Sequence, residues 1–259
     1  MPASFIACPK CGHIPPQPLG ATDACPACGV YMHKWPPQRI TRRAAAVVEN
    51  PDENDLWHER LRTLPGKDAG DPALLAGRAA VLLALLVWGL YLITRDVTNG
   101  EVGQSFMHNI LLVIHEAGHV LFRPFGEFMT IAGGSLFQIF LPLAIGVAFL
   151  LKNRDPFGAA VCLWWTGISF VDLAPYIYDA LDPQLMLLGG HTGEDGPHDW
   201  IYLFETLGGL QHAHAWGRFA RATGGLLAVG ALGWAAWVLW LAHQRQHNDS
   251  ARIRNNKKA

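Results

Sequence analysis

The sequence predicts an all-α polytopic membrane bundle of about five or six transmembrane helices, preceded by a small N-terminal domain with four cysteines. Hydrophobic residues make up 51% of the 259 residues and charged residues only 16%, against about a quarter in soluble domains. The two kinds are unevenly spread, because residues 1–71 are polar and long apolar runs fill residues 72–242. The net charge of −1 provides no large basic surface, so we expect no nucleic-acid partner.

The N-terminal domain, residues 1–34, is predicted from two CxxC pairs separated by 13 residues. A CxxC turn aims two thiolates at one tetrahedral Zn²⁺, and Gly12 or Gly29 after each pair supplies the positive φ that such a turn needs. The pattern resembles a zinc ribbon with one structural zinc, held by Cys8, Cys11, Cys25 and Cys28. Disulfides are the alternative, which a reducing cytoplasm disfavours. The start MPASFIACPK has no secretory signal, so we expect this domain to be cytoplasmic.

Residues 35–72 have the composition of a linker, with prolines, arginines and an acidic stretch. Four apolar side chains fall at near-helical spacing within it, namely Leu56, Trp57, Leu61 and Leu64. Two interpretations stay open, a short interfacial helix on the membrane surface or a partly ordered tether.

Residues 73–243 are predicted to form the transmembrane domain, and residues 244–259 a basic tail. Five apolar stretches occupy approximately residues 74–94, 102–122, 128–151, 156–180 and 222–242. Each can cross about 30 Å of hydrocarbon at about 1.5 Å rise per residue. Unpaired backbone groups are too costly in lipid for irregular chain, so every span should be a helix.

Basic residues on the flanks of this domain decide its expected orientation as a multi-pass integral membrane protein. The N-terminal flank carries Arg39, Arg42, Arg43, Arg60, Arg62 and Lys67, whereas the first loop between spans has only Arg95. By the positive-inside rule, the N-terminal domain faces the cytoplasm. Five spans would put the basic tail outside, against the same rule, unless residues 201–210 add a sixth or re-entrant element. The side of the tail stays open.

Residues 113–120, VIHEAGHV, place an HExxH motif inside the second apolar stretch. On a helix, His115 and His119 project from nearly the same face, so both imidazoles can bind one metal ion. Glu116 can take a proton from the metal-bound water and pass it to a leaving amine. Ionisable side chains within a membrane helix are costly and usually functional, which favours a zinc site over groups that only pack against neighbouring helices.

A catalytic zinc needs a third protein ligand and an open position for water. The fourth stretch carries a polar stripe at helical spacing, with Asp172 and Asp179 as the candidate ligands. The second and fourth spans are expected to run in the same direction, so His119 and Asp172 would lie at similar depths. Asp179 would be about 10 Å farther along at about 1.5 Å per residue, so depth favours Asp172.

A membrane-embedded HExxH motif followed two spans later by an aspartate near a proline is similar to the site-two protease family of intramembrane zinc metalloproteases. In that family an Asn-x-x-Pro segment leads to Leu-Asp-Gly, whose aspartate is the third ligand. Here residues 172–175 read DLAP and residues 178–180 read YDA, so Asp replaces Asn, Ala replaces Gly and the spacing is one residue shorter. The resemblance, over about residues 102–180, implies Asp179 as the ligand, whereas depth favours Asp172, our preferred ligand.

The glycine-rich loop after the fourth span, residues 189–200, holds further polar side chains. Two interpretations stay open for His198 and Asp199. They belong to a solvated loop, with Asp199 near a helix start, or they form a lid or an outer shell around His115 and His119.

These patterns predict a zinc-dependent intramembrane endopeptidase with one catalytic and one structural zinc. Its substrate would be an extended segment of another membrane protein, because the amide bonds of a helix are shielded from attack. The four-cysteine site has no open coordination position, which assigns it to folding or docking. The alternative function is a non-catalytic membrane adaptor or regulator whose zinc ribbon binds a cytoplasmic protein partner.

Overall fold

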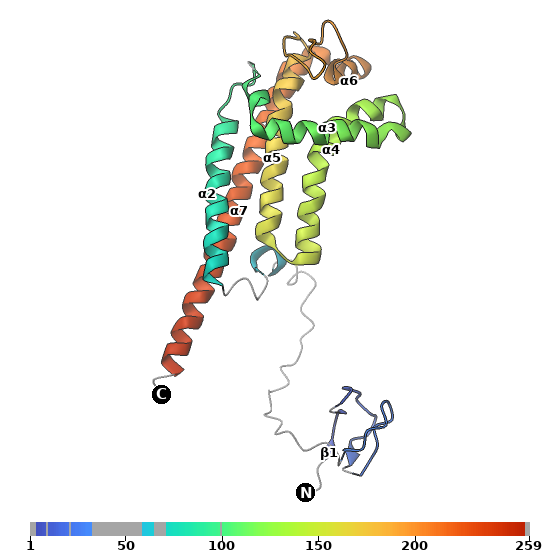
Figure 1. Cartoon of the computed structure of the whole chain (residues 1–259), viewed down its shortest axis with the longest axis vertical. Coiled ribbons are helices and arrows are strands. Elements are labelled where there is room, and N and C mark those ends of the chain that lie inside the picture. The colour runs from blue at the N-terminus through green and yellow to red at the C-terminus, as the bar shows by residue number, and fades with distance from the viewer. Residues whose placement is uncertain are drawn as a thin grey trace. The chain divides into compact units, whose positions relative to one another are not determined.

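The computed structural model describes residues 4–8, 10–20, 22–32, 59–64, 71–98 and 100–256. The chain divides into two compact units, Met1–Asp52 and Glu53–Ala259 (Figure 1). Each unit has a core of its own.

The N-terminal unit combines a two-stranded sheet with the two CxxC turns. Strand β1 (Ser4–Phe5) pairs antiparallel with strand β2 (Leu19–Gly20). The core beside this sheet contains Met32 and two of the cysteines, Cys8 and Cys25, all of them buried. With so few apolar side chains in its core, the unit depends on its sulfur atoms for cohesion.

Each CxxC turn closes as the glycine pattern predicts. The N–H of Gly12 donates to the carbonyl of Cys8 at 2.9 Å, and the N–H of Gly29 donates to the carbonyl of Cys25 at 2.8 Å. Both glycines have positive φ, 73° and 69°. A residue with a Cβ atom would be strained at either position.

Helices form almost all of the second unit. They are α2 (Pro72–Ile93), a 3₁₀ turn (Glu101–Gln104), α3 (Phe106–Phe122), a 3₁₀ turn (Arg123–Phe125), α4 (Glu127–Ala148), a π-helical turn (Phe149–Asn153), α5 (Pro156–Asp179), α6 (Asp199–Leu207), a 3₁₀ turn (Leu210–His212) and α7 (Ala213–Asn256). Within the described residues, four stretches are long and apolar enough to span a membrane: Pro72–Ile93, Glu127–Asn153, Pro156–Asp179 and Leu210–Asn248.

Sequence signals explain where two of these helices begin. The Asp71 carboxylate accepts the N–H of Ala73 at 2.9 Å, and a proline follows in the first turn of α2. Asp155 caps α5 in the same way and accepts the N–H groups of Phe157 and Gly158, both at 3.1 Å. Both boundaries therefore follow from local side-chain chemistry.

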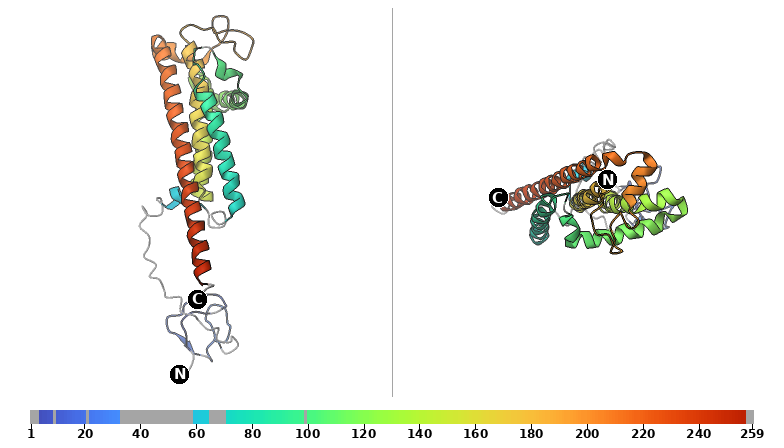
Figure 2. Two further views of the ribbon diagram at one scale, coloured as in Figure 1. Left: turned by 90° about the vertical axis from the view of Figure 1, so that its left-hand side faces the viewer. Right: turned by 90° about the horizontal axis from the view of Figure 1, so that it is seen from above.

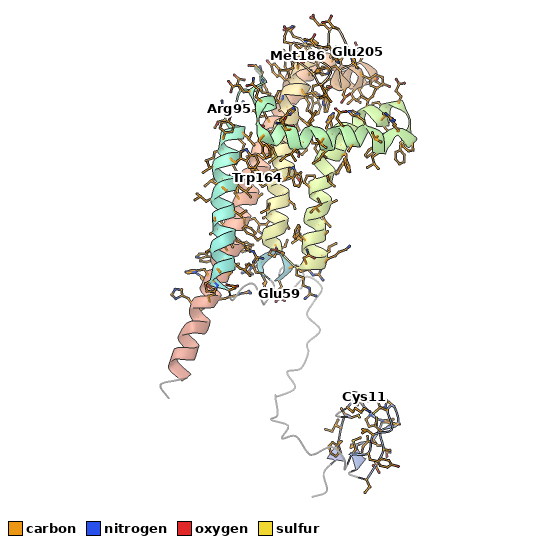
Figure 3. The ribbon with its side chains drawn as sticks, in the orientation of Figure 1. Cys11, Glu59, Arg95, Trp164, Met186 and Glu205 are labelled. Carbon is orange, nitrogen blue, oxygen red and sulfur yellow. The ribbon has the colours of Figure 1, made fainter. Side chains whose placement is uncertain are left out.

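Helix α5 is the most buried of the four candidate spans, with 72% of its apolar window inside the structure. It approaches α7 closely, because a Cβ atom on Gly167 would lie 2.7 Å from backbone atoms of Gly224 and Ala228. Trp164, labelled in Figure 3, fills the space toward α2, where its ring centroid lies 6.0 Å from that of Trp88. These contacts make α5 the helix around which the bundle is packed.

The second expected span, residues 102–122, does not run along the bundle. Figures 1 and 2 show α3 lying across the ends of the upright helices, with the start of α4 beside it. The chain reverses between them at Gly126, whose φ is 92°. The two helices pack closely because a Cβ atom on Gly118 or on Gly133 would collide with the other helix. The structure therefore has four candidate spans where five or six were expected.

The two ends of the membrane domain meet at one end of the bundle. The indole N–H of Trp234 on α7 donates to the carbonyl of Leu61 at 2.9 Å, and Arg245 donates to the hydroxyl of Thr63 at 3.3 Å. Leu64 is buried against α5 and α7. Four spans return the chain to its starting side, so the tail joins the N-terminal flank without a sixth span. Residues 201–210 hold most of α6 and the start of a 3₁₀ turn instead.

Two expected boundaries differ or lie outside the described residues. Helix α7 continues to Asn256, so residues 244–256 extend this helix instead of forming a separate tail. Within the expected linker, residues 59–62 are helical. Leu56 and Trp57, half of the expected interfacial helix, lie outside the described residues.

Candidate functional site

The four cysteines of the N-terminal unit form a cluster that could hold a metal ion, with all sulfur atoms within 4.8 Å of one another. The sulfurs of Cys8 and Cys28 lie 3.6 Å apart, and those of Cys11 and Cys25 lie 3.8 Å apart. Tetrahedral zinc with bonds of about 2.3 Å places its sulfurs about 3.8 Å apart, so this donor set fits zinc. All four are free thiols in the structure, which contradicts the disulfide alternative.

The backbone around Cys8 favours the thiolate that a metal needs. Desolvation acts to raise the pKa of the Cys8 thiol, but the N–H groups of Cys11 and Lys10 outweigh it and lower this pKa to about 6. Because four thiolates leave no open coordination position, this cluster can stabilise the unit but cannot activate water.

The HExxH motif lies on α3, and partners on α4 fix the Nδ1 atom of each histidine. Nδ1 of His115 lies 3.0 Å from Oε1 of Gln138, and Nδ1 of His119 lies 2.8 Å from the carbonyl oxygen of Thr130. Both partner oxygens only accept hydrogen bonds, so each Nδ1 carries the proton. Each Nε2 then keeps its lone pair, which is the atom that a metal ion would bind.

Asp199 faces both Nε2 atoms. Its Oδ2 lies 3.0 Å from Nε2 of His115 and 3.2 Å from Nε2 of His119. Ligands at about 2.05 Å around a tetrahedral zinc are about 3.3 Å apart, so the three atoms have the spacing of zinc ligands. Burial acts to raise the pKa of Asp199, but the two imidazoles outweigh it and lower this pKa to about 2. The carboxylate is therefore ionised at neutral pH.

The two imidazoles fit against α4 because residue 134 is a glycine. A Cβ atom on Gly134 would lie 2.5 Å from Nε2 of His115 and 2.7 Å from Nε2 of His119. Any side chain at this position would displace the two nitrogens that face Asp199.

Helix α5 positions Asp199 by holding the first turn of α6. The Tyr176 hydroxyl on α5 accepts the N–H of Asp199 at 2.9 Å. His198 caps α6 by accepting the N–H of Ile201 at 3.3 Å, and its ring packs on Tyr176 with centroids 4.3 Å apart. A residue expected in a loop or a lid thus reaches the two histidines from a fixed helix start.

Within the described residues, the group around His115 and His119 contains neither Asp172 nor Asp179. Asp172 lies 2.9 Å from Nδ1 of His108, and its other oxygen accepts the Nε2–H of Gln138 at 2.9 Å. The depth comparison that favoured Asp172 assumed two parallel helices, whereas α3 crosses the bundle. Asp172 therefore reaches His115 only through Gln138.

Asp179, the alternative third ligand, fastens the loop that leads to α6. One carboxylate oxygen accepts the N–H groups of Gln184 at 2.8 Å and Leu185 at 3.0 Å. The other oxygen lies 3.4 Å from Nε2 of His198. Asp179 thus joins the two ends of this loop, and His198 supports the first turn of α6.

A cavity of about 620 Å³ opens onto His115, His119 and Asp199. Helices α3 and α5 and the loops around residues 100–104 and 184–191 form its walls. Glu116 lines this cavity with an exposed side chain. Its carboxylate makes no hydrogen bond within the part of the chain that the structure describes, so it is free to act on a molecule in the cavity.

Sequence reasoning missed two residues of this network, His108 and Gln138. His108 lies seven residues before His115 and hence on nearly the same face of α3. Gln138 is a lone amide within an apolar stretch, and polar side chains in such stretches usually have a function. Either signal could have been found.

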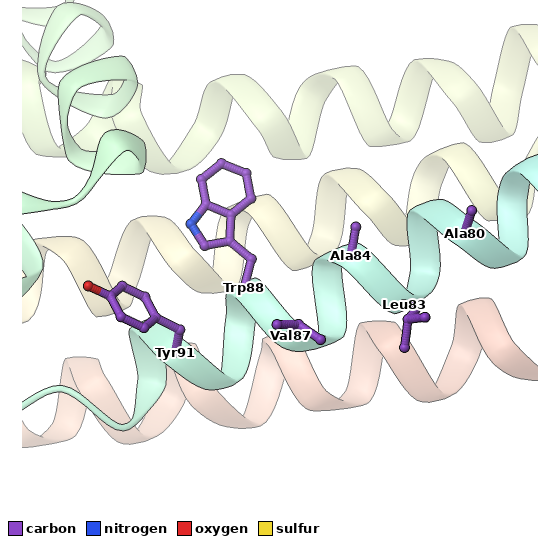
Figure 4. A pocket seen from close by; sticks show the side chains of 6 residues that line it. All are labelled: Ala80, Leu83, Ala84, Val87, Trp88 and Tyr91. Atoms are coloured by element: carbon purple, nitrogen blue, oxygen red, sulfur yellow. The ribbon is translucent and has the colours of Figure 1, made fainter.

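The outer face of α2 has a second, shallow hollow (Figure 4). Its walls are almost wholly apolar, and they consist of Ala80, Leu83, Ala84, Val87, Trp88 and Tyr91. None of these side chains is a usual metal ligand, so the hollow suits contact with lipid chains and not chemistry.

No model of a known protein family matches the chain, and neither a curated protein nor a solved structure matches it.

Proposed function

We propose that the chain is a zinc-dependent endopeptidase embedded in the membrane. The observation that carries this proposal is that Nε2 of His115, Nε2 of His119 and Oδ2 of Asp199 converge beside a free carboxylate. All three atoms present lone pairs, so a cation is needed to hold them together. Two imidazoles and one carboxylate are a common ligand set for catalytic zinc, which leaves a fourth position open. Zinc bound there would polarise water and a peptide carbonyl.

Glu116 is the residue placed to move protons. It follows His115 directly, and its carboxylate lines the cavity without a partner among the described residues. Such a carboxylate can take a proton from the attacking water and deliver it to the nitrogen of the leaving amine. Gln138 and the carbonyl of Thr130 meanwhile hold the two imidazoles in place.

An extended peptide segment suits the cavity as a substrate. The volume of about 620 Å³ lies within the range of about 300 to 1,000 Å³ that is typical of ligand sites. Leu185 and Leu187 add apolar wall beside the polar group, which fits a segment of a membrane protein. The HExxH resemblance to site-two proteases supports this class, although the third ligand here comes from the start of α6.

We assign one structural zinc to the four cysteines and place their unit in the cytoplasm. The assignment is supported by the sulfur distances, and the location by the positive-inside rule. A docking role for this unit rests only on the closed four-thiolate chemistry.

The proposal is tested with full-length protein in detergent, a mixture of quenched fluorescent peptides and zinc counted by mass spectrometry. We expect two zinc ions per chain in the wild type and one in the His115→Ala variant. Glu116→Gln should keep both zinc ions and lose cleavage, because it removes only the proton carrier. Glu127→Gln, an exposed carboxylate at the start of α4, is the matched control and should cleave like the wild type.

Undiminished cleavage by Glu116→Gln would refute the proposed mechanism. One zinc per chain in both the wild type and His115→Ala would refute the metal centre and would favour the adaptor function instead.

A further inference from the structure

Charged side chains mark two levels along the long helices of the second unit. At one end, Arg78 on α2 pairs with Asp155 at the start of α5, 3.4 Å away. At the other end, Arg221 on α7 donates to the carbonyl of Ile93 at 3.0 Å, and Arg95 lies just after α2. Arg78 and Arg95 are 17 residues apart, which is about 26 Å along a helix and close to the hydrocarbon thickness of about 30 Å.

The metal-ligating group lies at the second of these levels. Tyr176 is 21 residues beyond Asp155, about 32 Å along α5, and its hydroxyl contacts the backbone of Asp199. Figure 3 shows Met186, which lines the cavity, at the same end of the bundle as Arg95. Met186 is 72% exposed. The group therefore sits at the edge of the apolar zone and not in its middle.

Helix α3, which carries the histidines, has the pattern of a helix that lies on a membrane surface. Phe106, Val113 and Val120 are seven residues apart and form an apolar stripe, each at least 60% exposed. His108 and His115 lie on the opposite face, toward the cavity, because two residues turn a helix by about 200°. Since α3 lies across the bundle (Figure 1), the stripe can enter lipid while the histidines face the cavity.

Basic residues flank the first level and not the second. The chain enters α2 and leaves α7 at the first level, beside the Arg245 contact with Thr63. The sequence before α2 includes six basic residues between positions 39 and 67, and the sequence after position 251 includes four. By the positive-inside rule the first level faces the cytoplasm, so the second level faces the other side.

We infer that the metal centre opens in the surface layer of the membrane on the side opposite the C-terminal tail, and that its substrate is an extended segment adjoining the membrane helix of another protein. A peptide bond at the bilayer midplane would lie about 15 Å from this level, out of reach of Glu116. The inference rests on the proposed zinc centre, and it replaces cleavage within the bilayer core by cleavage at the membrane surface.

The test compares the side from which a membrane-impermeant chelator removes each zinc. Full-length protein with a C-terminal tag is placed in sealed vesicles of both orientations, and protease removal of the tag reports the side of the tail. Vesicles are then exposed to EDTA, and the zinc left per chain is counted. The zinc missing in His115→Ala identifies the centre, and the zinc missing in Cys8→Ser identifies the four-cysteine cluster.

We expect EDTA opposite the tail to remove the His115-dependent zinc and EDTA on the tail side to leave it in place. Loss from the tail side, or loss only after detergent is added, would overturn the inference while leaving the zinc centre intact. If no zinc depends on His115, the proposed function fails and the inference fails with it. Because the wild type and His115→Ala are compared directly, the result stands even where Cys8→Ser unfolds the N-terminal unit.

Discussion

Gln138 offers the sharpest test of how this protein would prepare a histidine for metal binding. Its side chain is 1% exposed, its Nε2 donates to Asp172 at 2.9 Å and its Oε1 lies 3.0 Å from Nδ1 of His115. An ionised Asp172 only accepts hydrogen bonds, so the amide must turn its NH₂ group toward Asp172 and its oxygen toward His115. Asp172 therefore selects the His115 tautomer whose Nε2 is free for metal.

Gln138→Met keeps the length of the side chain and removes both hydrogen bonds. Nδ1 of His115 and one oxygen of Asp172 then lose their partner inside the protein, and the imidazole is no longer held in one tautomer. Losing a partner of this kind typically lowers metal affinity about 10- to 100-fold, which is about 1.4 to 2.8 kcal/mol. The unpaired groups also lower the free energy of unfolding by about 1 to 3 kcal/mol each.

The affinity of the His115-dependent zinc is measured by competition with a chromophoric chelator on full-length protein in detergent. Gln104→Met is the matched control, because Gln104 lines the same cavity and is exposed. Asp172→Asn should also weaken zinc, since an amide at this position lets Gln138 turn its NH₂ group toward His115. Unchanged zinc affinity in a folded Gln138→Met variant would refute the tautomer argument, and so would an equal loss in Gln104→Met.

Three further outcomes follow from the same structure. Asp199→Asn should lose the His115-dependent zinc, because a neutral amide replaces the only anionic ligand, while Asp195→Asn in the nearby loop should retain it; equal zinc counts in both variants would contradict the assignment. Gly134→Ala should reduce that zinc to below half occupancy because its Cβ would lie 2.5 Å from one Nε2, whereas Gly233→Ala, with open space around it, should not; binding by Gly134→Ala at wild-type affinity would count against the geometry. Cys8→Ser should lose one zinc and keep peptide cleavage in detergent, and a loss of both zinc ions would show that the two sites are coupled.

Local patterns carried much of the prediction. The two CxxC turns with their glycines, the helical placement of His115 and His119 and the proline-led start of α5 each depend on residues a few positions apart. Short-range geometry of this kind is fixed by backbone angles and hydrogen bonds within one turn, so sequence spacing alone predicts it. The composition similarly indicated a helical membrane domain, because lipid permits few alternatives.

The sequence by itself determined that a pair of histidines and a glutamate stand ready on one helix and that a four-cysteine cluster precedes the apolar helices. Only the tertiary structure decided the direction of α3, and with it the third member of the group. Helix direction depends on close packing at Gly118 and Gly133, which brings together residues that periodicity treats independently. Asp199 lies 80 positions after His119 and meets it because Tyr176 holds the start of α6. No spacing rule links such distant residues, so three-dimensional packing alone distinguished Asp199 from Asp172 and Asp179.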